Sequence, residues 1–291
     1  GGTSLAPLTI RETIEQNEEL LLSPYAAKSA RCGPRARPEE PCPIRAAYQR
    51  DRDRIIHSKA FRRLKHKTQV FLSPEGDHYR TRLTHTLEVA QIARTMARAL
   101  RLNEDLTEAI ALGHDLGHTA FGHAGERILQ QVCPLGFEHN LQSVRVIERL
   151  ERNGQGLNLT PEVLDGVACH TGEIKASTLE GRLVHYADRI AYINHDIDDA
   201  LRGGILSERD IPDFVAKTLG ETHSQRIATM IRAVIDESAG KNFVGMRPDI
   251  EQAMDRLRSF LFERVYRNSA AKSEEGKAMD MLARLYEYFI A

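Results

Sequence analysis

From Ala46 almost to the C-terminus, apolar residues recur at intervals of three and four positions, and prolines are rare. This spacing places apolar side chains along one face of an α-helix, whereas a half-buried strand alternates apolar and polar positions. One short run, residues 68–72, reads as an extended segment and is followed by turn-forming residues 74–77. The sequence therefore predicts an all-α fold.

Proline positions indicate where the helical region begins. Five of the 11 prolines fall between Pro24 and Pro43, and such a stretch holds neither a regular helix nor a central strand. We therefore expect a Pro-rich N-terminal arm (residues 1–45), a helical core (46–205) and a C-terminal helical region packed on the core (206–291). The arm is expected to be a loop or to become ordered on contact.

Charge and composition exclude several classes of protein. The 40 Lys and Arg residues balance 41 Asp and Glu residues, which argues against a dedicated duplex-DNA binder. No run approaches the ~18 consecutive apolar residues of a membrane-spanning helix, and no basic-then-apolar signal segment opens the chain. The four cysteines form no CxxC pair, so neither a disulfide framework nor a zinc–thiolate site is expected. We expect a cytoplasmic protein with no membrane partner.

Three predicted helices carry the polar residues of interest. The first, 82–100, is apolar on most sides, so we expect it to be buried. The second, 104–118, follows Asn103, which is a favourable N-cap residue. The third, 178–201, stops before Gly203 and Gly204.

Residues 114–126 combine ionisable side chains with glycines. The ionisable residues are His114, Asp115, His118, His123 and Glu126, and the glycines are Gly113, Gly117, Gly122 and Gly125. His114 and His118 lie four positions apart and would share one face of a helix. Each helical glycine costs about 1 kcal/mol, so this composition indicates a site rather than ordinary core packing.

A metal centre is one interpretation of this segment. His114 and Asp115 can both reach a metal ion from one helix, the first helix supplies His85, and the third supplies Asp188. Two imidazoles and two carboxylates suit Mn, Mg, Fe, Co or Ni better than a structural zinc ion. From the spacing alone, a buried network of His–Asp salt bridges explains the pattern equally well.

Several sequence blocks, joined in order, resemble a known family. They are KTQVF (67–71), RTRLTH (80–85), HDLGH (114–118), FGHAGE (121–126) and YADRIAY (186–192). They are similar to the bacterial deoxyguanosine-triphosphate triphosphohydrolases, which are HD-domain metal-dependent phosphohydrolases, and more distantly to the vertebrate SAM-and-HD-domain dNTPase. The resemblance is strong over residues 45–205 and weaker through 246–248 and 260–266. It implies an HD-domain helical bundle with additional C-terminal helices.

The resemblance also implies a reaction and its machinery. Water would attack the alpha phosphorus of a dNTP, preferably dGTP, and release a 2′-deoxynucleoside and tripolyphosphate. By position, the ligands of the divalent metal ion would be His85, His114, Asp115 and Asp188. The catalytic group would comprise His123 paired with Glu126, together with His118, and would move protons to or from water and the leaving oxygen. The alternative role for His123 is to ligate a second metal ion.

Substrate contacts follow from the same resemblance. Phosphate contacts would come from Arg82, His118, His139 and Arg189, and the 3′-hydroxyl would be bound by Gln69 and Asp196. Tyr192 would stack under the sugar and leave no room for a 2′-hydroxyl. The alternatives are that Tyr192 is a core aromatic residue and that Arg189 is a surface residue.

The expected partners are a dNTP substrate, a dNTP effector in the manner of some relatives, and further copies of the chain in a hexamer or tetramer strapped by the N-terminal arm. A basic run could serve phosphates, an effector or single-stranded DNA, or be a solvated helix face: Lys59, Arg62, Arg63, Lys65 and Lys67. Two competing functions remain. One is another HD phosphohydrolase that acts on a 5′-monophosphate, a cyclic nucleotide or guanosine tetraphosphate, and the other is a non-catalytic nucleotide sensor.

Overall fold

The computed structural model describes residues 7–67, 80–266 and 269–291, and within them the chain forms helices and no strand. The predicted all-α fold is confirmed. The predicted extended run 68–72, its turn and Gln69 lie outside the described residues. The helices are α1 (Ile10–Leu21), α2 (Ala47–Ile56), α3 (Lys59–Arg63), α4 (Arg82–Ala99), α5 (Glu104–Gly113), α6 (Gly122–Val132), α7 (His139–Arg145), α8 (Pro161–Ala168), α9 (Leu179–Arg202), α10 (His223–Ser238), α11 (Pro248–Leu261) and α12 (Ser269–Ile290).

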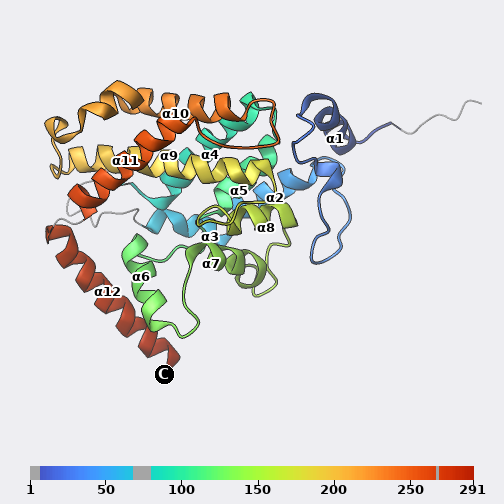
Figure 1. Cartoon of the computed structure of the whole chain (residues 1–291). Helices are drawn as coiled ribbons and strands as arrows, with labels where there is room; N and C mark the ends of the chain where they lie inside the picture. Colours follow the sequence, from blue (N-terminus) through green and yellow to red (C-terminus); the bar gives the residue numbers. More distant parts are fainter. Residues whose placement is uncertain (1–6, 68–79, 267–268) are drawn as a thin grey trace, which may run out of the picture.

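Helix α9 runs through the middle of the molecule (Figure 1) and packs against α4, α5, α8, α10 and α11. Its 24 residues correspond to a rod of about 36 Å. The apolar residues Leu183, Ile190 and Ile193 are fully buried along it. Thr178 caps its first turn by accepting a hydrogen bond from the Gly181 backbone N–H. The predicted limits of this helix agree with α9 to within one residue.

The predicted helix over 104–118 is too long. Asn103 caps α5 as expected, by accepting a hydrogen bond from the Leu106 backbone N–H. However, α5 ends at Gly113, and residues 114–117 form a turn. Ser143 of α7 binds this turn, because its hydroxyl accepts a hydrogen bond from the Gly117 N–H at 2.9 Å and lies 2.9 Å from the His114 carbonyl oxygen. Backbone groups released at the end of the helix are thereby satisfied, and His114 and His118 do not share a helix face.

The N-terminal arm packs against the helical core of the same chain. It includes α1, a helix that precedes the stretch from Pro24 to Pro43 and is capped at its N-terminus by a Thr9–Glu12 capping box. Further along, Glu180 at the start of α9 accepts hydrogen bonds from the backbone N–H groups of Ala27 at 3.0 Å and Asn103 at 2.8 Å. Glu180 therefore joins the arm, α5 and α9 at one buried point.

A pH prediction follows from Glu180. Burial raises the pKa of Glu180 from 4.5 to about 7, although hydrogen bonds from Asn103 and Ala27 oppose this. The unfolded chain releases this proton near pH 4.5 and the folded chain near pH 7, so this residue makes the free energy of unfolding fall as the pH rises across that interval. Glu180→Gln keeps the acceptor oxygen and removes the titration. We expect its stability relative to wild type to increase by about 1–3 kcal/mol between pH 5 and 7.5 in urea denaturation. A difference that does not change with pH would contradict the assignment.

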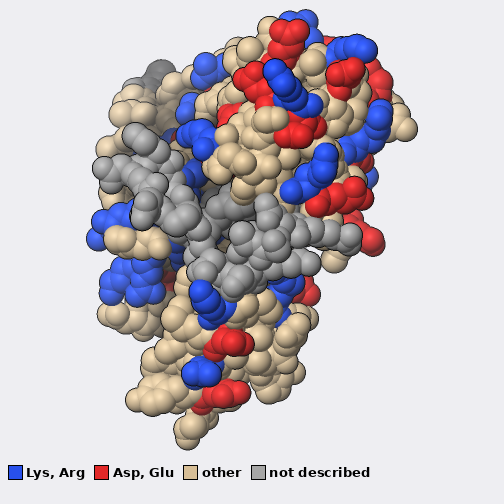
Figure 2. All heavy atoms as spheres, turned by 90° about the vertical axis from the view of Figure 1, so that its left-hand side faces the viewer, with Lys and Arg blue, Asp and Glu red and all other residues tan. Residues whose placement is uncertain are grey.

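The C-terminal helices cover two sides of the core. Helices α10 and α11 pack on α9, whereas α12 packs against α6 at the lower left of Figure 1. Figure 2 shows the face of the molecule that lies on the left of Figure 1. Acidic and basic side chains intermingle over the upper part of that face, and its lower part carries few charges. Exposed apolar residues on α12 include Leu285, Tyr288 and Phe289. Among the described residues, no helix has both the length and the apolar content needed to cross a bilayer.

Candidate metal centre and catalytic group

The structure brings the four predicted metal ligands together from separate segments. His85 comes from α4, His114 and Asp115 from the turn after α5, and Asp188 from α9. His85 Nε2 lies 3.0 Å from Asp188 Oδ1. His114 Nε2 lies 3.6 Å from Asp115 Oδ1 and 3.7 Å from Asp188 Oδ1. His85, His114 and Asp115 are buried, and the Asp188 side chain remains 19% exposed, so the cluster reaches the surface at Asp188.

The ring of His114 is oriented as a metal ligand would be. Its Nδ1 lies 2.6 Å from the Ala111 carbonyl oxygen. A carbonyl only accepts hydrogen bonds, so Nδ1 carries the proton and the neutral ring presents a lone pair at Nε2. That buried Nε2 makes no hydrogen bond, yet it faces two carboxylates. A divalent cation would satisfy all three groups, and a backbone carbonyl on the other ring nitrogen is the usual support for a histidine ligand.

Electrostatics of the cluster also favour a positive charge. Burial raises the pKa of Asp188, but its interactions with the side chains of His114 and His85 outweigh burial and hold the pKa well below its usual range. Burial lowers the pKa of His114, but the charge of Asp115 and the interaction with Asp188 raise it to about 9. Two carboxylates that stay ionised in a buried site require compensation by a cation or a proton.

Arg82, which the sequence predicts to contact phosphate, lies beside the His/Asp cluster and binds the predicted metal ligand Asp115. Its guanidinium Nη1 donates to Asp115 Oδ2 at 2.6 Å, and both side chains are only 4% exposed. This charge-assisted hydrogen bond fixes one oxygen of Asp115 and leaves Oδ1 directed at His114.

The predicted catalytic residues adjoin this cluster. His123 is exposed on the first turn of α6, and its Nδ1 lies 3.6 Å from Glu126 Oε2. Glu126 Oε1 accepts hydrogen bonds from the backbone N–H and from Nδ1 of His139, at 2.9 and 2.8 Å. The buried His118 ring stacks on His139 with 4.6 Å between ring centroids. His139 Nε2 is 4.0 Å from Asp115 Oδ1, so the predicted metal ligands and the predicted catalytic residues meet at His139.

Glu126 stays ionised in this setting. Burial raises its pKa, but hydrogen bonds from His123 and His139 outweigh burial and lower the pKa far below its usual range. A permanent carboxylate can hold His123 and His139 in fixed orientations.

The sequence interpretation missed His170. This buried residue follows α8, and its ring packs edge-on against His114 with 4.9 Å between ring centroids. Its Nε2 lies 3.1 Å from His139 Nε2. No local motif surrounds it, and the only signal was its place in the histidine-rich interval between His57 and His195.

Three further predicted substrate contacts, Tyr192, Asp196 and Arg189, all lie on α9. Tyr192 and Asp196 follow Asp188 by one and two turns on α9; Tyr192 is partly buried and Asp196 is buried. Burial raises the pKa of Tyr192. Arg189 pairs instead with Asp255 and Glu251 of α11, at 2.5 and 3.7 Å, so the structure does not bring it to the histidine cluster.

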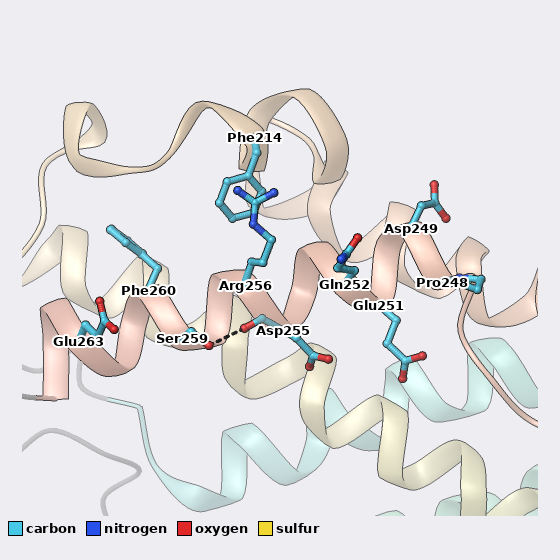
Figure 3. Close-up of a pocket in the computed structure, with 10 residues that line it drawn as sticks. All are labelled: Phe214, Pro248, Asp249, Glu251, Gln252, Asp255, Arg256, Ser259, Phe260 and Glu263. Carbon is cyan, nitrogen blue, oxygen red and sulfur yellow. Dashed lines mark hydrogen bonds between the residues drawn. The ribbon is translucent and has the colours of Figure 1, made fainter.

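The acidic partners of Arg189 line a separate groove along α11 with a volume of about 910 Å³. Figure 3 shows the guanidinium of Arg256 beside the Phe214 ring, 4.0 Å from its centroid. The predicted site residues are not among those that line this groove. It is therefore distinct from the metal centre.

Comparison with known proteins supports the assignment suggested by the sequence blocks. Residues 82–193 match the HD domain, and residues 244–291 match the phosphohydrolase-associated domain. The chain is 62% identical to the deoxyguanosinetriphosphate triphosphohydrolase-like protein of Caldanaerobacter subterraneus subsp. tengcongensis, over 97% of this chain and 83% of that protein. The chain belongs to this family. A protein of the same name from Desulfatibacillum aliphaticivorans is 54% identical, over 97% of this chain and 84% of that protein.

The family resemblance expected from the sequence is thus confirmed, and the matches support a phosphohydrolase. A hypothetical protein from Aquifex aeolicus with a crystal structure has a TM-score of 0.52 and 22% identity, over 81% of this chain. This chain spans 60% of that protein, and the likeness supports the fold alone.

Proposed function

We propose that this protein is a metal-dependent triphosphohydrolase that cleaves dGTP to 2′-deoxyguanosine and tripolyphosphate, and that it acts on other dNTPs as well. The observation that carries the proposal is the junction at His139. There the buried His/Asp cluster meets the Glu126–His123 pair, with His139 Nε2 4.0 Å from Asp115 Oδ1 and Nδ1 2.8 Å from Glu126 Oε1. A group able to hold a cation therefore lies next to a group able to move protons. The names of the relatives suggest the substrate.

The metal ion would be held by His85, His114, Asp115 and Asp188, which suit Mn, Mg, Fe, Co or Ni. When bound, such an ion polarises a phosphoryl oxygen and makes water a stronger nucleophile. The exposed fraction of Asp188 gives the cluster access to solvent, as an approaching phosphate requires.

The protein's own residues supply proton transfer and substrate grip. Glu126 orients His123 and His139, and His123 exchanges a proton with the attacking water or the leaving oxygen, a role worth about 10²–10⁴-fold in rate. His118, stacked on His139, lies where it can contact the triphosphate. Tyr192 and Asp196, one and two turns beyond Asp188, would bind the sugar, and Tyr192 would exclude a 2′-hydroxyl.

Product analysis tests this function. Metal-replete protein is incubated with dGTP, with each other dNTP and with pairs of dNTPs, and the products are separated by anion-exchange chromatography. We expect deoxyguanosine and tripolyphosphate in equal amounts from dGTP. Release of orthophosphate or pyrophosphate would favour a different HD phosphohydrolase, and binding without turnover under every pairing would favour a nucleotide sensor. Asp188→Asn, which alters a predicted ligand, is the control for contaminating activity.

A further inference from the structure

His85, the predicted metal ligand on α4, differs from His114 at its second ring nitrogen. His114 Nδ1 lies 2.6 Å from the Ala111 carbonyl oxygen, whereas His85 Nδ1 is buried and has no hydrogen-bond partner within the described residues. A neutral ring that offers Nε2 to a cation carries its proton on Nδ1. A histidine that ligates a metal almost always donates this other N–H to an acceptor. His85 therefore needs a buried acceptor whenever it holds a metal ion.

The ring of His195 on α9 packs against His85. Their centroids lie 5.5 Å apart, and the rings meet edge-on at 81°. His195 is only 1% exposed, and its Nδ1 is likewise buried without a hydrogen-bond partner in the part of the chain that the structure describes. Between rings at this separation, a direct hydrogen bond needs only a small rotation, and one water molecule can also bridge them. Two neighbouring buried rings thus each have an unpaired Nδ1.

Glu88 determines which nitrogen of His195 is able to accept. His195 Nε2 contacts Glu88 Oε2, and Glu88 follows His85 by three residues on α4, so the two share one face of that helix. Arg80 Nη1 donates to both oxygens of the same carboxylate at 2.6 Å and holds it in place. Burial lowers the pKa of His195 to about 2, so its ring is neutral. A carboxylate accepts hydrogen bonds, so Nε2 of His195 carries the proton and Nδ1 presents a lone pair.

We propose that His195 is a positioning residue of the metal centre: its Nδ1 accepts the Nδ1–H of His85, and Glu88 fixes the tautomer of His195 that can do so. The chain carboxylate–imidazole–imidazole extends the usual carboxylate–histidine pair behind a metal ligand by one ring. It favours the form of His85 whose Nε2 is free to bind a cation. In the other tautomer, His85 Nε2–H donates to Asp188 Oδ1 at 3.0 Å, and His195 Nδ1 then faces a second acceptor.

The experiment compares the Mn²⁺ affinity of two amide variants of His195. Asn places its amide oxygen near the position of Nδ1 and can still accept from His85, whereas Gln reaches only the position of Nε2, beside Glu88. Protein stripped with a chelator is titrated with Mn²⁺, and the free ion is measured by electron paramagnetic resonance. His85→Ala shows which part of the titration belongs to this site. We expect His195→Gln to weaken binding there by about 10–100-fold, the usual effect of losing the partner of a ligating histidine, and His195→Asn to remain close to wild type.

Two further variants separate positioning from packing. His195→Phe keeps a ring in the same space but offers no acceptor, so it should lose affinity as His195→Gln does. His223→Ala is the matched control, because the His223 ring stacks on His195 with 6.5 Å between centroids while its Nδ1 pairs with Asp198 at 2.6 Å; it should keep wild-type affinity. Equal affinity in His195→Asn and His195→Gln, or no loss in His195→Phe, would overturn the proposal.

A second measurement uses only the wild-type protein. In protein with isotope-labelled histidine, loaded with diamagnetic Zn²⁺, nuclear magnetic resonance should show His195 protonated at Nε2 alone and His85 protonated at Nδ1. A proton on Nδ1 of His195 would reject the proposal. The inference rests on the metal centre of the proposed function, but it is measured without substrate. Metal binding with this proton pattern but without dGTP cleavage would refute the proposed function and leave the inference standing, and a wild-type chain that binds no Mn²⁺ would refute both.

Discussion

Replacing His123 with alanine is expected to lower kcat for dGTP cleavage by about 10²–10⁴-fold while leaving the metal content unchanged. His123 is 66% exposed on α6 and lies beside Glu126, so its loss removes a proton-transfer group without disturbing buried packing. The measurement combines kcat at saturating dGTP with bound manganese in the same preparation.

The metal measurement decides between two roles. His118, His123 and Glu126 also lie close enough together to share an ion, so a variant that loses metal together with activity would make His123 a ligand. His57→Ala is the control, because His57 is an exposed histidine at the end of α2; it should retain wild-type kcat.

Gly117→Ala is expected to destabilise the protein by about 3 kcal/mol or more. A Cβ atom at Gly117 would lie 2.2 Å from the Ser143 backbone nitrogen and 2.3 Å from the Gln142 carbonyl carbon. Backbone atoms of α7 cannot rotate away as a flexible side chain would, so the turn carrying His114 and Asp115 must separate from α7. Urea denaturation monitored by circular dichroism measures the loss.

Gly276→Ala is the matched control for this substitution. Gly276 lies within α12, and a Cβ there would meet no atom within 4 Å. Alanine in a helix interior is favoured over glycine by about 1 kcal/mol, so this variant should equal or exceed wild-type stability. Equal stability of wild type and Gly117→Ala would show that the close approach of α7 is not required.

The helices were predictable where a local pattern determines them. The capping residue Asn103 located the start of α5, and the apolar period and the glycines after residue 201 located α9, because these signals act within the helix or at its ends. The end of α5 was not predictable in this way. It depends on Ser143, which is distant in sequence and reaches the turn only after α7 has packed.

The residues of the site likewise differ in whether local sequence or tertiary packing determines their position. The spacing of His114 and Asp115, together with the family blocks, led to His85 and Asp188, which the structure places within hydrogen-bonding distance of each other. His170 has no such local context, because α8 brings it to His114 through tertiary packing alone. Arg189 was a candidate phosphate contact, because a guanidinium suits bidentate binding of phosphate, with a surface role as the alternative; in the structure its acidic partner Asp255 lies on α11.

Glu180, which binds the N-terminal arm, lies eight residues before Asp188 on α9, a separation of about 12 Å along a continuous helix. A cut in the chain near Ala27 would therefore remove a hydrogen-bond donor from the first turn of the same rod that positions Asp188. Loss of the contact between the arm and Glu180 would therefore affect the position of Asp188, because both residues belong to one rigid helix. An intact N-terminal segment is accordingly a sensible purity criterion for any preparation used to count ions or turnover.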